Sequence, residues 1–95
     1  MPLDSSILGA LRCFEMAGRL LSFTKTAQAL SLTQSAVSQQ IRHLEERLGY
    51  RLFERHSRGL VMTPKGKTLW DVTSRAFHDI DHALEQLGPS EIPRG

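Results

Sequence analysis

Apolar residues recur at spacings of three and four along the first half of the chain, and this periodicity predicts three amphipathic helices. The first helix is expected over residues 6–18, with Gly18 at its end. The second is expected over residues 23–30 after the N-cap Ser22, and the third over residues 34–48 after the N-cap Thr33. Gly49 suits the end of the third helix. The expected core residues are Leu11, Phe14, Phe23, Leu30, Val37, Ile41, Leu44 and Phe53.

The hydrophobic pattern changes after Gly49, where two short apolar segments predict a β-hairpin. The segments are residues 52–55 and 60–62, and Gly59 lies in the turn between them. Thr63 and Pro64 then have the residue types of an N-cap and a first helical position. A helix from Pro64 to Leu87 would be about 36 Å long at roughly 1.5 Å per residue.

Along this last helix a stripe of residues alternates spacings of three and four, which is the pattern of the 3.5-residue coiled-coil period. A helix of this length cannot bury such a stripe against the small domain that precedes it. We therefore expect two copies of the chain to form a homodimer through this helix. The expected dimerisation residues are Trp70, Thr73, Phe77, Ile80, Leu84 and Leu87.

The composition limits the classes of protein to which the chain can belong. Its 95 residues suffice for one small domain with an appendage. Cys13 is the single cysteine, so the chain cannot form an internal disulfide. No apolar run approaches the ~20 residues of a membrane span, and the start of the chain lacks a signal sequence. The sequence therefore predicts a cytoplasmic protein without membrane association.

Charge is distributed unevenly along the chain. Residues 42–67 hold seven Lys and Arg against three Glu, a net charge of +4. Residues 68–95 hold two Arg against five acidic residues, a net charge of −3. A basic surface attracts a polyanion such as DNA, although a solvated charged surface fits these charges equally well. Glu45 lies near Arg42 and Arg47 and could stabilise the helix by ion pairing, but a solvated charge is the favoured interpretation.

The outer face of the predicted third helix carries short polar side chains followed by an arginine. An α-helix fits the ~12 Å major groove of DNA, where Gln pairs with adenine, Arg with guanine, and Ser donates or accepts. Solvated helix faces are usually rich in Lys and Glu, whereas this face is uncharged until Arg42. The sequence therefore favours base readout over a solvated face. The expected DNA-binding residues here are Thr33, Gln34, Ser35, Ser38, Gln39 and Arg42.

Two arginines in the predicted hairpin indicate a second DNA contact. Arg55 and Arg58 flank His56 and Ser57. Arginine on a narrow hairpin can enter the electronegative minor groove. A solvated turn is the alternative, but a hairpin directly after a candidate recognition helix is better interpreted as a DNA-binding wing.

Three other functions compete with sequence-specific DNA binding. A protein-interaction module would display large apolar anchors where the chain has Ser35, Ser38 and Gln39. Non-specific DNA binding would favour lysine-rich contacts. An enzyme would need a nucleophile–base pair, a phosphate-binding loop or a metal cluster, and the sequence indicates none. His78 and His82 form one i, i+4 pair with too few further ligands, so neither a metal nor a cofactor is expected.

Several motifs, in one ungapped order, resemble the N-terminal domain of LysR-type transcriptional regulators. The chain has SFTKTAQAL at residues 22–30, TQSAVSQQI at residues 33–41 and LFER at residues 52–55. Thr26 departs from the family's usual alanine, which would alter packing in the second helix. The resemblance covers residues 7–87 and also includes Leu44, Glu45, Leu48, Gly49, Leu60, Thr63 and Gly66.

The resemblance implies a mainly α fold. It implies a winged helix-turn-helix domain of three helices and a two-stranded wing over residues 1–63, a dimerisation linker helix over residues 64–88 and an extended tail over residues 89–95. Such a domain binds an inverted-repeat operator in double-stranded DNA as a dimer, with a recognition helix in the major groove and a wing in the minor groove. An effector domain that binds a small-molecule inducer is expected to follow the tail.

Overall fold

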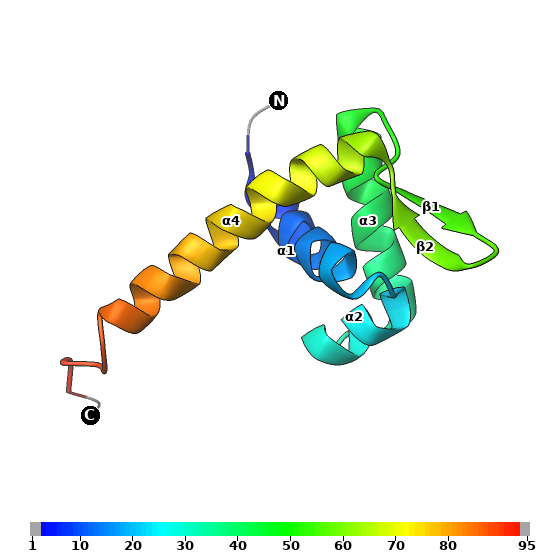
Figure 1. The fold of residues 1–95 in the computed structure, drawn as a ribbon. Helices are drawn as coiled ribbons and strands as arrows, with labels where there is room; N and C mark the ends of the chain where they lie inside the picture. Colours follow the sequence, from blue (N-terminus) through cyan, green and yellow to red (C-terminus); the bar gives the residue numbers. More distant parts are fainter. Residues whose placement is uncertain (1–2, 94–95) are drawn as a thin grey trace.

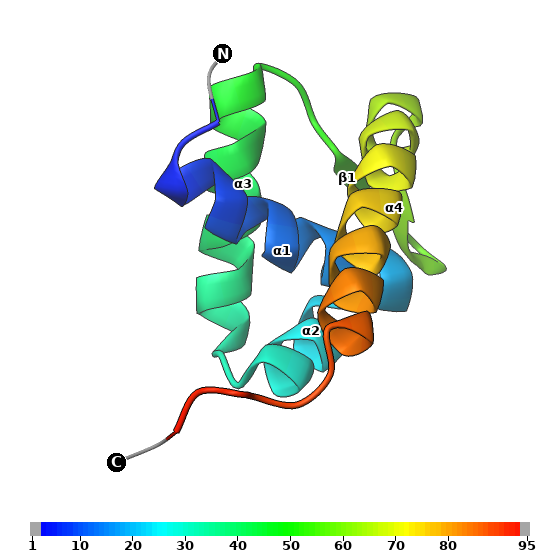
Figure 2. The same ribbon diagram turned by 90° about the vertical axis from the view of Figure 1, so that its left-hand side faces the viewer.

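The computed structural model describes residues 3–93 as four helices and one antiparallel hairpin (Figure 1). Helix α1 lies between α3 and α4, and α4 crosses α1 and extends beyond it on the side away from the hairpin (Figures 1 and 2). This architecture confirms the predicted mainly α fold with a winged helix-turn-helix. The elements are α1 (Ser5–Leu20), α2 (Phe23–Leu30), α3 (Gln34–Leu48), β1 (Phe53–His56), β2 (Gly59–Met62) and α4 (Pro64–Gln86).

Side-chain caps fix the starts of α2 and α3 at the predicted residues. Ser22 Oγ accepts a hydrogen bond from the Lys25 N–H at 3.1 Å, and Thr33 Oγ1 accepts one from the Ala36 N–H at 3.0 Å. Each hydroxyl satisfies one of the N–H groups that have no partner within the helix. Helix α3 ends at Gly49, whose φ of 87° lies in the left-handed region.

Helix α1 does not end at Gly18, and this prediction is wrong. The helix continues to Leu20, after which Leu21 takes a left-handed conformation and donates its N–H to the Ala17 carbonyl at 2.8 Å. Gly18 instead makes room for the indole of Trp70, because a Cβ at this position would lie 2.2 Å from a ring carbon. The glycine therefore marks a close approach between two helices.

The core lies where α1, α2 and α3, which together form the body of the domain, meet β1. The ring of Phe53 packs edge-to-face against Phe14 and Phe23, with centroid distances of 5.5 and 5.7 Å. Val37 and Leu44 turn the apolar face of α3 inward. The polar face of α3 is consequently left outside. Of the other predicted core residues, Ile41 is buried, and Leu11 and Leu30 are half-buried at the margin.

Helix α4 is anchored to α1 by aromatic contacts. The Trp70 indole donates its N–H to the Glu15 carbonyl at 2.8 Å. About two turns further along α4, the Phe77 ring centroid lies 5.1 Å from the Arg12 guanidinium carbon. Thr73 lies between them on the same helix face and is buried. The first half of α4 therefore packs on the body, whereas its second half is exposed.

The second half of the chain departs from the prediction by small shifts. Antiparallel pairing of His56 with Gly59 leaves Ser57 and Arg58 as the tip of the hairpin. Helix α4 ends at Gln86, one residue earlier than expected, with Leu87 as its C-cap. Residues 88–93 form neither helix nor strand, and the last two residues of the predicted tail lie outside the described part of the chain.

Asp4 caps α1 and connects it to the end of α3. Its Oδ1 accepts hydrogen bonds from the Ile7 N–H at 3.0 Å and the Ser6 hydroxyl at 2.8 Å, and its Oδ2 lies 3.2 Å from Arg47. These contacts, the Ile7 hydrogen bond first among them, lower the pKa of Asp4 from 3.8 to about 2.

This lowered pKa predicts a specific sensitivity to acid. A carboxyl with a lower pKa in the folded state stabilises the fold above its unfolded pKa, and that contribution is lost as the pH falls through the folded pKa. We expect the melting temperature of the wild type to fall more steeply between pH 3.8 and about 2 than that of Asp4→Asn. Asparagine keeps a capping oxygen but does not titrate. If the melting temperatures of the two proteins fell in parallel with pH, this role of Asp4 would be contradicted.

Candidate nucleic-acid interface

The outer side of α3 presents one continuous polar surface. Its members line a single shallow depression, and all are exposed except the half-buried Ser38. Thr33 lies at the start of this surface, and its hydroxyl caps the helix. The structure thus brings together the predicted residues of α3. We call this surface the polar face; it consists of Gln34, Ser35, Ser38, Gln39 and Arg42.

A groove connects the polar face to the hairpin. Arg42 from α3 and Arg51 and Arg55 from the hairpin segment line it, so three guanidinium groups border one surface. Glu45 and Glu54 also line the groove. Guanidinium groups bind phosphate with two parallel hydrogen bonds, so a groove bordered by three of them can receive a polyanion backbone.

The two predicted wing arginines lie in different surroundings. The Arg55 guanidinium carbon lies 5.4 Å from the Phe23 ring centroid, so this side chain folds back toward α2. Arg58 is exposed at the tip of the hairpin. The strand register separates them, because Arg55 pairs with Leu60 inside the ladder. Arg58 is therefore the arginine of the pair that projects from the tip.

Arg51 is a member of the groove that the sequence did not predict. Its side chain is 72% exposed and its Nε lies 3.4 Å from a Glu45 oxygen. It stands in the segment between α3 and β1, where no local pattern distinguishes it from other surface arginines. The excess of positive charge between residues 42 and 67 was the one sequence signal that included it.

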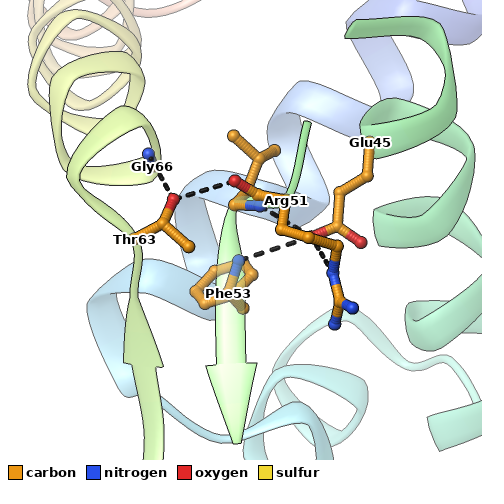
Figure 3. A network of polar contacts seen from close by, with 6 residues as sticks. Glu45, Arg51, Phe53, Thr63 and Gly66 are labelled. Carbon is orange, nitrogen blue, oxygen red and sulfur yellow. Dashed lines mark hydrogen bonds and ion pairs between the residues drawn. The ribbon is translucent and has the colours of Figure 1, made fainter. Parts of the chain in front are cut away.

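Glu45 is not the solvated charge expected from the sequence. Its Oε2 accepts the N–H of Leu52 at 2.7 Å and the N–H of Phe53 at 3.3 Å (Figure 3). Only 12% of its side chain is exposed. A carboxylate that accepts from backbone N–H groups forms the stronger, charge-assisted kind of hydrogen bond. Glu45 therefore holds the start of the hairpin against α3.

Thr63 holds the hairpin from its other end. Its hydroxyl donates to the Arg51 carbonyl at 2.8 Å and accepts the Gly66 N–H at 3.0 Å (Figure 3). Its own N–H donates to the Leu52 carbonyl at 2.9 Å. These bonds join the start of β1 to the first turn of α4. The position of the hairpin is therefore fixed relative to both α3 and α4.

The six residues predicted to pair two copies are not equally available. Trp70, Thr73 and Phe77 lie on the side of α4 that packs on α1. Ile80, Leu84 and Leu87 are 53%, 60% and 77% exposed. Part of the predicted stripe is thus already occupied within one chain, which the 3.5-residue period alone does not reveal.

Other chemical sites find little support in the described residues. Within residues 3–93, no group of three His, Cys, Asp or Glu side chains could hold a metal ion. The rings of His78 and His82, with centroids 6.4 Å apart, are not part of such a group. Burial raises the pKa of the Cys13 thiol to about 11, which disfavours the nucleophilic thiolate. None of the described helices is both long and apolar enough to cross a bilayer.

Comparison with known proteins places this arrangement among regulators. A family model described as "Bacterial regulatory helix-turn-helix protein, lysR family" matches residues 8–67. The chain is 51% identical over 84 residues to the HTH-type transcriptional regulator BlaA of Proteus vulgaris. The aligned region covers 88% of this chain and 29% of BlaA. It is 52% identical over 80 residues to the HTH-type transcriptional activator AmpR of Providencia stuartii, with coverages of 84% and 27%. The chain thus spans less than a third of the length of these relatives.

Solved structures share the fold. The crystal structure of the BenM_DBD/catB site 1 DNA complex matches with a TM-score of 0.76 and 35% identity, covering 84% of this chain and 90% of that chain. The structure of Vibrio fischeri DarR in complex with DNA matches with a TM-score of 0.72 and 28% identity, covering 92% of this chain and 29% of that chain. Both of these structures are complexes with DNA.

Proposed function

The chain belongs to the lysR family of bacterial regulatory helix-turn-helix proteins, and on this basis we propose that it is the DNA-binding domain of a transcriptional regulator. The observation that carries the proposal is the polar face of α3, which is exposed, continuous and free of carboxylates. The relatives of the chain are regulators of transcription and not enzymes.

Helix α3 acts as the recognition helix in the major groove. Ser35 and Ser38 are short, so the helix can approach the base edges closely. Gln34 and Gln39 offer the donor and acceptor pair that matches adenine, and Arg42 offers the fork that matches guanine. Thr33 begins the helix, and the N–H groups of its first turn favour a phosphate at this end.

The hairpin acts as the wing beside the recognition helix. Arg58 at its tip enters the minor groove, whose negative potential attracts arginine. Arg55 and Arg51, which border the groove next to Arg42, contact the phosphate backbone. Glu45 and Thr63 support this function by holding the hairpin at a fixed position relative to α3.

A homodimer through α4 would present two recognition helices to an inverted-repeat operator. The exposed apolar residues Ile80, Leu84 and Leu87 support pairing through the second half of α4. In this proposal residues 1–63 bind DNA, residues 64–88 pair the copies and residues 89–95 lead to an effector domain that binds a small-molecule inducer.

The experiment that tests sequence-specific binding is a titration of the chain with a randomised duplex pool, followed by sequencing of the bound fraction. We expect enrichment of a two-fold symmetric motif with half-sites about one helical turn apart. Binding without enrichment would reduce the function to non-specific backbone contact. An absence of binding at low salt would contradict the proposal as a whole.

Arg42 provides a sharper test at the level of one residue. We expect Arg42→Ala to weaken binding to the enriched site by about 1–3 kcal/mol, and to weaken binding to random duplex much less. Fluorescence anisotropy on the two duplexes measures both losses. Arg75→Ala, which removes the same charge from α4, is the matched control and should leave the discrimination unchanged. An equal loss on both duplexes would make Arg42 a phosphate contact.

A further inference from the structure

Helix α1 buries a carboxylate on the side that packs against α4. Arg12 of α1 lies over the ring of Phe77. Gly18 of α1 faces the indole of Trp70. At ~100° per residue, Glu15 lies midway between these two positions around the helix, about 60° from each. The Glu15 side chain is fully buried, and its carbonyl accepts the Trp70 N–H. Glu15 therefore belongs to the contact between α1 and α4.

The hydrogen bonds of this buried carboxylate are incomplete. Glu15 Oε1 accepts a hydrogen bond from the Arg19 guanidinium. Glu15 Oε2 is buried and has no hydrogen-bond partner within residues 3–93. A buried carboxylate oxygen without a donor raises the free energy of the fold, because in water the same oxygen would be hydrated. The packing of α4 on α1 therefore carries a free-energy penalty at Glu15.

Arg19 does not share this penalty. Its side chain is 54% exposed, so it reaches Glu15 from the margin of the contact between the helices. Both residues belong to α1 and are four positions apart, so their ion pair persists when α4 moves away. Water then reaches Glu15 Oε2 without any loss of the ion pair. Hydration of Glu15 therefore favours the separation of α4 from α1.

Other contacts act in the opposite direction and keep α4 on α1. The Trp70 N–H donates to the Glu15 carbonyl at 2.8 Å, and the indole fills the space beside Gly18. Thr73 is buried, and the Phe77 ring is half-buried. Burial of aromatic surface stabilises this contact despite the unpaired oxygen of Glu15. We call the contact the joint; its residues are Arg12, Glu15, Gly18, Trp70, Thr73 and Phe77.

The first turn of α4 is held separately from the joint. Thr63 bonds to the Arg51 carbonyl and to the Gly66 N–H, which joins this turn to the start of β1. Beyond this turn α4 crosses α1 and extends away from the body (Figures 1 and 2). Separation at the joint therefore swings α4 about its first turn. Gln86 lies about 24 Å beyond Trp70 at roughly 1.5 Å per residue, so a swing of about 10° displaces it by about 4 Å.

We propose that Glu15 determines the range of operator geometries that the protein accepts, because its buried carboxylate lowers the free-energy cost of separating α4 from α1. The proposal rests on the dimeric function proposed above, in which α4 connects the two recognition helices. A joint that separates easily lets each α3 adjust to half-sites whose spacing differs from the preferred one. A joint without the buried carboxylate holds α3 more rigidly and accepts fewer operators.

Exchange of the Trp70 indole N–H with deuterium measures separation at the joint, because this N–H exchanges only after it leaves the Glu15 carbonyl. Glu15→Met supplies an unbranched apolar side chain without a charge. We expect NMR of the full chain to show exchange at least about threefold slower in Glu15→Met than in the wild type. The control Glu91→Met removes an exposed carboxylate from the tail and should change the rate by less than about twofold. Equal or faster exchange in Glu15→Met would overturn the proposal.

Arg19→Met tests the joint in the opposite direction. Without the guanidinium, both oxygens of Glu15 lack their donor while α4 covers them, so the penalty increases. We expect the Trp70 N–H to exchange at least about threefold faster than in the wild type. The double variant Glu15→Met/Arg19→Met should behave as Glu15→Met does, because no carboxylate remains to be satisfied. Slower exchange in Arg19→Met would contradict the assigned penalty.

Operator spacing provides a readout that a merely structural role of Glu15 would not change. The affinity for the enriched operator is compared with the affinity for versions that are one base pair longer or shorter between the half-sites. We expect Glu15→Met to bind the enriched operator within about twofold of the wild type, and to lose at least about fivefold more affinity on the altered versions. Equal losses for the two proteins would overturn the role of Glu15 in operator choice.

The two measurements separate this proposal from the one on which it rests. A wild type that binds all spacings equally overturns the dimeric function, and the role of Glu15 in operator choice fails with it. The exchange measurement needs no DNA, so slower exchange in Glu15→Met would still establish the effect of Glu15 on the joint. A wild type that prefers one spacing, with a Glu15→Met variant of unchanged preference, overturns this proposal and leaves the dimeric function intact.

Discussion

Replacing Glu45 by alanine is expected to lower the free energy of unfolding by about 2–3 kcal/mol and to weaken DNA binding at the same time. The Glu45 carboxylate accepts the N–H groups of Leu52 and Phe53 and is 12% exposed. Without it, both N–H groups are left without a partner at the buried start of β1, and the loss includes their desolvation. The hairpin also loses its connection to α3, so Arg51 and Arg55 no longer stand at fixed positions beside Arg42.

Urea denaturation measures the first effect, and titration with operator DNA under folding conditions measures the second. Glu45→Gln is the matched control, because its amide oxygen still accepts from the backbone while the charge is removed. We expect this variant to lose only about 1 kcal/mol. Equal losses for alanine and glutamine would mean that the ion pair with Arg51 matters and the backbone hydrogen bonds do not.

Gly66→Ala is expected to lower the free energy of unfolding by about 2–4 kcal/mol, although alanine is normally the better helix residue. A Cβ at Gly66 would lie 2.2 Å from the Leu52 carbonyl oxygen and 3.1 Å from its carbonyl carbon. This carbonyl accepts the Thr63 N–H at 2.9 Å, so it cannot retreat without breaking that bond. The added methyl group therefore forces β1 and α4 apart.

Gly9→Ala is the control for this substitution. Gly9 lies in α1, and a Cβ there would have no atom within 4 Å. We expect it to raise the free energy of unfolding by about 0.5–1 kcal/mol through helix propensity alone. Measurement of both variants by urea denaturation gives opposite signs if the packing at Gly66 is as described. A stabilised Gly66→Ala would show that α4 and β1 separate at no cost.

The starts of α2, α3 and α4 could be predicted because they depend on local chemistry. Ser22, Thr33 and Thr63 each cap the helix that follows them, and a hydroxyl three residues before an N–H is visible in the sequence. The end of α1 could not be predicted, since the chain turns at a left-handed leucine rather than at a glycine. Gly18 has a tertiary reason, its contact with Trp70, and 52 positions of sequence separate the two residues.

The candidate site shows the same division. The polar face of α3 could be predicted because one helix supplies all of it, and helical geometry fixes which residues share a face. The environment of Arg55 depends on a ring in α2, and the role of Glu45 depends on backbone N–H groups seven and eight residues later. Likewise, the period of α4 predicts an apolar surface, but only the position of α1 shows which side of the helix is already covered.

The contact between Trp70 and α1 has a spectroscopic consequence. Trp70 is the single tryptophan of the chain, and its indole N–H is bonded to a carbonyl of α1. Indole fluorescence responds to this bond and to water near the ring. Trp70 does not belong to the polar face of α3. The emission of the unlabelled protein therefore reports on whether α4 keeps its contact with α1.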